Sequence, residues 1–153
     1  MGHRESTRLR TQISYRFGIP LIYLSGELDQ ESAGDLRQVI QQELAIGGAG
    51  LLLECSELTY IDSTGLSVLF ETLRAPKEQG HMTIVGPQPR ILKLMELTGL
   101  IDRSGVNVYP DLASAVAALG SLEETRRLLT QPASEPGVPL GINRGQRGMW
   151  SSG

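Results

Sequence analysis

One short stretch of the chain, Tyr60–Leu66, concentrates the side chains best suited to chemistry. It contains a carboxylate, Asp62, and two hydroxyls, Ser63 and Thr64, and an apolar pattern at helical spacing follows it. The first turn of a helix carries unpaired backbone N–H groups and the positive end of the helix dipole, so a phosphate placed there is stabilised. We therefore expect a hydroxyl of this stretch to be phosphorylated and dephosphorylated, which would switch a binding surface.

A hydrolytic enzyme would need more than these hydroxyls. A serine nucleophile requires a base within reach, usually histidine, and the chain has only His3, in a polar segment, and His81, at the start of an expected strand. The sequence also lacks the Gly-x-Ser-x-Gly pattern of a nucleophile elbow. A serine hydrolase is therefore not predicted.

Metal and nucleotide sites are not predicted either. The single cysteine, Cys55, and the two scattered histidines lack the spacing of a metal-binding set. The glycines at 47, 48 and 50 lack the lysine of a phosphate-binding loop and precede an expected strand, so we interpret them as a helix stop. We expect no bound metal and no cofactor.

Three carboxylates, Glu27, Asp29 and Asp62, lie at the ends of expected strands and could meet at one edge of a sheet. An acid–base pair is the catalytic interpretation of such a group. Acidic residues at helix starts are commonly caps, and spacing alone allows that interpretation here. The adjoining Ser63-Thr64-Gly65 at a helix entrance favours a functional site.

The bulk composition is that of a globular protein. With 153 residues, 40% hydrophobic and 20% charged, the chain suits one domain with a proper core. Its formal charge of −3 predicts no net attraction to nucleic acid or an anionic membrane. The N-terminus has no apolar segment of a signal peptide, no apolar run reaches membrane-spanning length, and one cysteine allows no internal disulfide. We expect a cytoplasmic protein.

The hydrophobic pattern predicts strands alternating with helices. The expected strands cover residues 11–17, 21–24, 51–55, 82–85 and 106–109. The expected helices cover residues 31–45, 64 to about 74, where Pro76 interrupts the pattern, 89 to about 99, and 111 to about 129. Such alternation predicts an α/β fold, with a mixed sheet of about five strands, parallel at its centre, and four helices packed on it.

Two terminal segments stand outside this pattern. Residues 1–10 are polar and predict a flexible arm, and residues 11–130 form the expected domain. Residues 131–153 contain repeated prolines and glycines with almost no apolar periodicity, which predicts a disordered tail. Its Trp150 is either an exposed aromatic without a role or a short docking motif.

Four motifs in order give the chain a resemblance. They are Gly26-Glu27-Leu28-Asp29, then Ile61-Asp62-Ser63-Thr64-Gly65-Leu66, then Gly80 before a strand, and Leu97-Thr98-Gly99-Leu100 after a helix. Together they resemble a STAS domain, and within that family the bacterial anti-sigma factor antagonists. The resemblance covers about residues 11–119.

The resemblance implies a phosphorylation switch. Ser63 matches the serine that a partner kinase, itself an anti-sigma factor, phosphorylates, and Thr64 is the less usual acceptor. A metal-dependent serine phosphatase would reset the switch, with no direct DNA binding and no membrane partner. The unphosphorylated protein would bind the kinase and release its sigma factor. The implied partner-binding surface comprises Glu27, Leu28, Asp29, Asp62, Ser63, Thr64, Gly65 and Leu66.

Two other functions remain open at this point. The same fold could serve as a scaffold module without a switch, in a signalling or lipid-transport complex, although the intact Ser63 hydroxyl argues against it. A small hydrolase or nucleotide-binding enzyme is the alternative from a different class, and the lack of a base argues against that.

Overall fold

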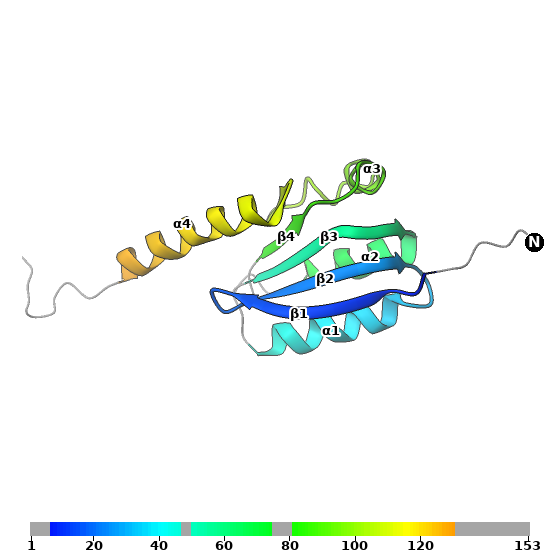
Figure 1. Cartoon of the computed structure of the whole chain (residues 1–153), viewed down its shortest axis with the longest axis horizontal. Coiled ribbons are helices and arrows are strands. Elements are labelled where there is room, and N and C mark those ends of the chain that lie inside the picture. Colours follow the sequence, from blue (N-terminus) through cyan, green and yellow to red (C-terminus); the bar gives the residue numbers. More distant parts are fainter. Residues whose placement is uncertain (1–6, 47–49, 75–80, 131–153) are drawn as a thin grey trace, which may run out of the picture. The chain divides into compact units, whose positions relative to one another are not determined.

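A computed structural model describes residues 7–46, 50–74 and 81–130 of the chain (Figure 1). The chain divides into two compact units, Met1–Ala117 and Ala118–Gly153, and the sheet and the site lie in the first. The strands are β1 (Arg10–Arg16), β2 (Ile19–Leu28), β3 (Gly50–Ile61), β4 (His81–Val85) and β5 (Val106–Tyr109). The helices are α1 (Ala33–Ala45), α2 (Ser63–Thr72), α3 (Pro89–Leu97) and α4 (Leu112–Thr130).

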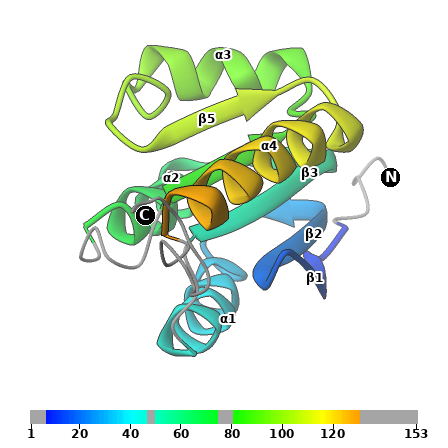
Figure 2. The ribbon, with the colours of Figure 1, turned by 90° about the vertical axis from the view of Figure 1, so that its left-hand side faces the viewer.

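The five strands form one mixed sheet in the order β1-β2-β3-β4-β5. The β1 strand runs antiparallel to β2, and β2, β3, β4 and β5 are parallel to one another. Helices α1, α2 and α3 connect the successive parallel strands, as parallel pairing requires. Figure 2 shows β1 and α1 at one end of the sheet and β5 and α3 at the other. The expected α/β fold, with five strands and four helices, is confirmed.

The main core lies between one face of the sheet and α1, α2 and α3. Each helix contributes the apolar stripe that its sequence pattern predicts, for example Leu36 and Ile40 from α1 and Leu69 from α2. In β3 the consecutive residues Leu51, Leu52 and Leu53 are all buried, so this central strand is covered on both faces. Among the residues that the structure describes, no helix is both long and apolar enough to cross a membrane.

The strand β3 is longer than its apolar pattern predicts, because it continues from Cys55 to Ile61. In this extension the side chains of Leu58 and Ile61 are buried, whereas the intervening Thr59 and Tyr60 are exposed. The pairing of β3 with β2 contains two irregularities here, which break the strict alternation that marks a strand in sequence. The extension matters for function because it carries the chain to Asp62.

The N-terminal segment contacts the sheet within the stretch 1–10 that was expected to be a flexible arm. The Thr7 carbonyl accepts a hydrogen bond from the Glu27 N–H at 3.0 Å. Leu9 packs against the core, and β1 begins at Arg10. Gly26 permits this contact, since its φ is +100° and a Cβ there would lie 2.6 Å from the Arg8 carbonyl oxygen. Residues 1–6, Pro76 and the tail 131–153 lie outside the described residues.

Candidate functional site

The parallel pairing of β2 with β3 brings the predicted site residues together. Leu28, the last residue of β2, pairs with Ile61, the last residue of β3. The two strands therefore end at the same edge of the sheet, and the next residues are Asp29 and Asp62. The Asp62 N–H donates to the Leu28 carbonyl at 3.2 Å, which fixes the two chain segments to each other. Residues 33 positions apart in sequence thus share one surface, as the strand-end argument predicts.

Asp62 is the N-cap of α2 and holds both segments. Its Oδ1 accepts the Gly65 N–H at 3.0 Å, which satisfies one of the unpaired N–H groups at the helix start. Its Oδ2 accepts the Gln30 N–H at 3.1 Å, from the loop between β2 and α1. The capping interpretation of Asp62 is therefore correct, and the carboxylate also links the two loops of the site.

Asp29 organises the loop between β2 and α1. Its Oδ1 accepts the N–H groups of Glu31 at 3.0 Å and Ser32 at 3.1 Å. The Ser32 hydroxyl is buried, accepts the Asp29 N–H at 3.0 Å and lies 3.0 Å from the Glu27 carbonyl. Ser32 is the N-cap of α1 by position, although its side chain caps no helix N–H. These hydrogen bonds hold the loop in place around the half-buried Asp29.

Ser63 is the first residue of α2 and is exposed, whereas Thr64 is only partly exposed. The Ser63 hydroxyl makes no hydrogen bond to the residues that the structure describes. The Ser63 carbonyl accepts the Ser67 hydroxyl at 2.9 Å, one turn along the helix. Of the two hydroxyls at the helix entrance, that of Ser63 is the more accessible to another protein.

Three residues of the predicted binding surface lie beneath it instead. Leu28 is fully buried, Leu66 is 7% exposed and Gly65 is buried. A Cβ on Gly65 would lie 2.7 Å from Leu28 Cγ, so α2 approaches β2 as closely as a glycine allows. The expectation that these three residues form part of the surface is corrected: they support it from the core.

Sequence reasoning missed two contributors to the site. Gln30 contributes through its backbone N–H, which no side-chain motif reveals. Tyr60 is 44% exposed and pairs with Glu27 across the strands, so an aromatic ring borders the acidic surface. A half-exposed aromatic beside a polar motif is a usable sequence signal, because tyrosine is common in protein interfaces.

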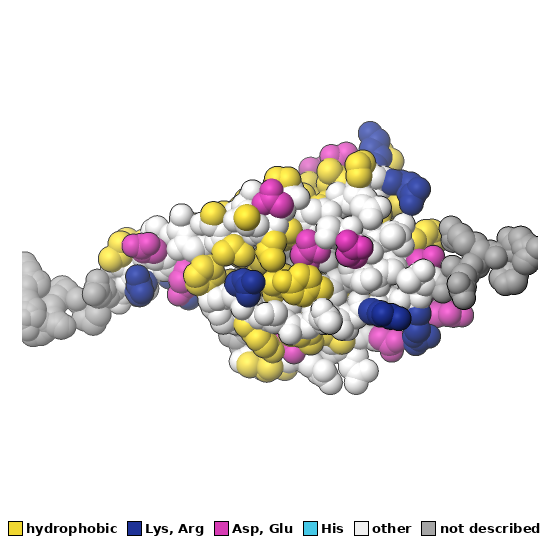
Figure 3. All heavy atoms as spheres, in the orientation of Figure 1, with side chains coloured by type: hydrophobic (Ala, Val, Ile, Leu, Met, Phe, Trp, Pro, Cys, Tyr) yellow, Lys and Arg dark blue, Asp and Glu magenta, His cyan; other side chains and the backbone are white. Residues whose placement is uncertain are grey.

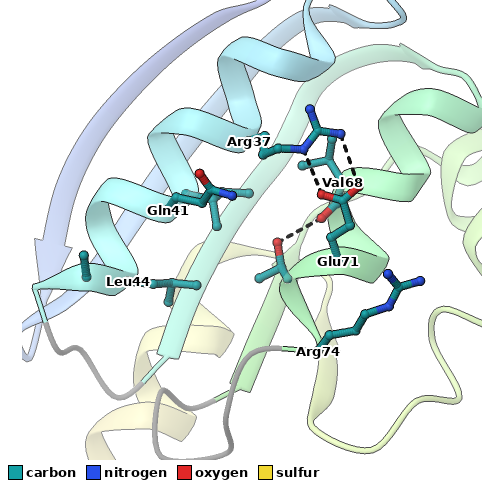
Figure 4. A pocket seen from close by; sticks show the side chains of 9 residues that line it. Arg37, Gln41, Leu44, Val68, Glu71 and Arg74 are labelled. Carbon is teal, nitrogen blue, oxygen red and sulfur yellow. Dashed lines mark hydrogen bonds and ion pairs between the residues drawn. The ribbon is translucent and has the colours of Figure 1, made fainter.

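A pocket lies apart from this surface, between α1 and α2 (Figure 4). It has a volume of about 360 Å³ and is bordered by the ion pair of Arg37 and Glu71, whose side chains meet at 2.8 Å and 3.2 Å. Figure 4 shows Arg74 on the other side of Glu71. The hydrogen bonds that Arg37 donates to the Glu71 carboxylate lower the pKa of Glu71 and raise the pKa of Arg37.

The remaining candidates for chemistry do not form a reactive site. Burial, with a smaller effect of the Glu54 charge, raises the pKa of Cys55 to about 12, so its thiol stays protonated. No group of three or more His, Cys, Asp and Glu side chains within the described part of the chain is placed to hold a metal ion.

Comparison with known proteins identifies the family to which this fold belongs. The profile of the STAS domain matches residues 11–115, and the chain belongs to the STAS domain family. The anti-sigma-B factor antagonist of Bacillus subtilis is 35% identical over 82 residues, which cover 53% of this chain and 74% of that protein. An anti-sigma factor antagonist from Mycobacterium paratuberculosis has a TM-score of 0.65 and 28% identity, covering 72% of this chain and 93% of that one.

The fold also matches the anti-sigma factor antagonist SpoIIAA. Its unphosphorylated form has a TM-score of 0.62 and 19% identity, covering 73% of this chain and 97% of that one. A phosphorylated form of the same protein from Bacillus has a TM-score of 0.55 and 20% identity, covering 73% of this chain and 99% of that one.

Proposed function

We propose that this chain is an anti-sigma factor antagonist switched by phosphorylation at Ser63. In the unphosphorylated state it binds an anti-sigma factor that is also a serine kinase, and this binding frees the sigma factor. The observation that carries the proposal is the placement of an exposed Ser63 at the first turn of α2, on one surface with Asp29 and Asp62. The names of the relatives and the phosphorylated form of SpoIIAA support the same interpretation.

Charge explains how a phosphate would end binding. Phosphorylation adds about −1.5 to −2 charges at pH 7 to a surface that already carries Glu27, Asp29, Glu31 and Asp62. The N-terminus of α2 attracts the phosphate, but Asp62 already accepts the Gly65 N–H there. A dianion placed in a close-fitting interface opposes association through charge and bulk, and no change of fold is required.

The chemistry under this proposal belongs to the partners. Both oxygens of Asp62 accept backbone N–H groups, so this carboxylate has a structural task and is not poised as a general base. The chain supplies the hydroxyl, a kinase supplies the phosphoryl transfer, and a metal-dependent serine phosphatase removes the phosphate. The chain itself then needs no cofactor and no metal ion.

Phosphate transfer tests the acceptor directly. Wild type, Ser63→Ala, Thr64→Val and Ser67→Ala are each incubated with ATP and an anti-sigma factor kinase from the same genome, and intact masses are measured. Ser67→Ala is the matched control, since it removes an exposed hydroxyl one turn further along α2. We expect every variant except Ser63→Ala to gain one phosphate. Equal phosphorylation of Ser63→Ala and wild type would contradict the assignment.

Kinase binding tests the switch separately from the acceptor. Ser63→Ala is expected to bind the kinase as wild type does, because the hydroxyl contributes little to a large interface. Ser63→Asp is expected to weaken binding at least tenfold, while Ser67→Asp has a smaller effect. If Ser63→Asp and the phosphorylated protein both bind the kinase tightly, the chain docks on the kinase but phosphorylation does not switch this binding.

A further inference from the structure

The β1 strand presents an open edge of the sheet. It is the first strand in the sheet order and pairs only with β2 among the residues that the structure describes. Figure 2 shows β1 at the end of the sheet opposite β5. An open edge of this kind exposes backbone N–H and C=O groups that can pair with a further strand.

The turn between β1 and β2 determines which backbone groups point outward. Phe17 and Gly18 form a two-residue loop with φ values of 54° and 76°, the geometry of a type I′ turn closed by the pair Arg16 and Ile19. In the closing pair Arg16 points its N–H and C=O groups toward β2, and this direction alternates from one residue to the next along an antiparallel ladder. The outward groups therefore belong to the residue just before Arg16 and to every second residue before that one. These are Tyr15, Ile13 and Thr11.

A side-chain contact supports this assignment. The Arg16 guanidinium donates through Nη1 to the Tyr15 carbonyl at 3.2 Å, so that carbonyl is accessible from outside the sheet. This hydrogen bond occupies one outward acceptor of the edge in the single chain.

The same outward residues carry exposed apolar side chains. Ile13 is 42% exposed and Tyr15 is 51% exposed, and their partners in β2 place both on the face that α1 covers. Tyr15 is fixed there, since its hydroxyl donates to Glu43 of α1 at 2.7 Å. Phe17, two residues after Tyr15, is also apolar and is 50% exposed. Its backbone has the left-handed conformation, which bulky side chains rarely adopt.

We propose that two copies of this chain associate by antiparallel pairing of β1 with β1, about a two-fold axis at Ile13. In this register Ile13 faces Ile13 of the second copy, and Thr11 faces Tyr15. Every outward-pointing residue then meets another outward-pointing residue, so the backbone hydrogen bonds of both edges can form. A pair of an aromatic and a β-branched side chain is also favourable across strands. The edge is therefore complementary to itself, and the product is one continuous ten-stranded sheet.

The charges on the other face of β1 oppose this pairing. The register places Arg10 of each copy opposite Arg16 of the other, and like charges directly opposite are unfavourable. Figure 3 shows basic side chains near both ends of β1 on this face. The dimer is accordingly weak. The fraction of the protein that is dimeric increases with protein concentration and with salt, because salt screens the repulsion.

The arginine pairs provide a test of the register by analytical ultracentrifugation over a range of concentrations. Arg10→Glu and Arg16→Glu each convert two repulsive pairs into two attractive ones, and each is expected to lower the dimer dissociation constant about tenfold. The double variant restores like-charge pairs and is expected to return to the wild-type constant. Lys93→Glu on α3 makes the same charge change away from β1 and is the matched control.

Blocking the edge provides a second test. Ile13→Pro removes an outward N–H without removing a donor to β2, and it is expected to give a monomer. If circular dichroism shows that the proline variant is unfolded, Ile13→Lys tests the same edge. The proposal is overturned if wild type and both single charge variants stay monomeric at the highest concentration. It is equally overturned if a dimer survives the substitutions at Ile13, or if the double charge variant is as tight as the single ones.

Discussion

The Oδ2 atom of Asp62 accepts the backbone N–H of Gln30 at 3.1 Å, across the boundary between α2 and the loop after β2. The other oxygen of the same carboxylate caps α2 through Gly65. A single side chain therefore sets both the start of the helix that presents Ser63 and the position of the loop that presents Asp29.

Substitution of Asp62 tests this double role. Asp62→Ala removes the cap and the loop contact, and we expect it to lower the free energy of unfolding by about 1–2 kcal/mol. Asp62→Asn has only one carbonyl oxygen, so it must give up one of the two hydrogen bonds and is expected to lose about half as much. Urea unfolding measures both, and an Asp62→Ala variant as stable as wild type would contradict the role.

The packing beneath the site predicts opposite effects for two glycines. Gly65→Ala would place a methyl group 2.7 Å from Leu28 Cγ and 2.9 Å from the Leu28 carbonyl oxygen. We expect this overpacking to destabilise the protein by about 1–3 kcal/mol. Gly34→Ala in α1 meets nothing within 4 Å and is expected to stabilise it by up to about 1 kcal/mol. Thermal unfolding of the two variants compares the same chemical change in both surroundings.

The buried thiol predicts resistance to labelling and a loss of stability at alkaline pH. Cys55 is fully buried and its pKa is raised to about 12, so a thiol reagent should modify it only after unfolding. Folding favours the protonated thiol, so this contribution to stability is complete below pH 9 and is lost between pH 9 and about 12. Cys55→Ala is expected to lack that part of the alkaline loss. Rapid labelling of the folded wild type would contradict the assignment.

The Arg37–Glu71 pair predicts a small dependence of stability on acid. The hydrogen bonds from Arg37, followed by the charges of Arg37 and Arg74, lower the pKa of Glu71 below its ordinary value of 4.5. The ionised form is therefore favoured by folding, and its contribution is present above pH 4.5 and lost as the pH falls through the folded pKa. Glu71→Gln is expected to reduce stability at pH 7 by less than Gly65→Ala does. As the pH falls below 4.5, the difference in stability between Glu71→Gln and wild type should shrink in urea unfolding.

Sequence patterns predicted the regular parts of the fold because burial there follows one period. In α1 the buried Leu36, Ile40 and Leu44 recur at helical spacing, and Gly99, with a φ of +84°, follows α3 where the third expected helix ends. The last helix was expected to begin at residue 111, and there the Oδ1 atom of Asp111 accepts the Ser114 N–H at 2.7 Å, at the start of α4. The second half of β3 was missed, because irregular pairing with β2 there replaces simple alternation.

The location of the site was predicted, but not which of its residues are exposed and which are buried. The order of strands and helices placed Asp29, Asp62 and Ser63 together, since parallel neighbouring strands end at one edge. Leu28 and Leu66 were placed on the surface because a motif groups neighbours in sequence without regard to which way they point. Their burial depends on how closely α2 approaches β2, a tertiary distance that Gly65 makes possible.

Buried Leu28, Gly65 and Leu66 are separated from exposed Gln30 and Ser63, and this separation has a consequence for the evolution of related proteins. The buried set fixes the geometry of the helix entrance, so the exposed set can change with little cost in stability. A duplicated copy could thus acquire a different partner through a few surface substitutions while keeping the same exposed hydroxyl at the start of α2. Several signalling routes in one cell could then use this architecture without cross-talk.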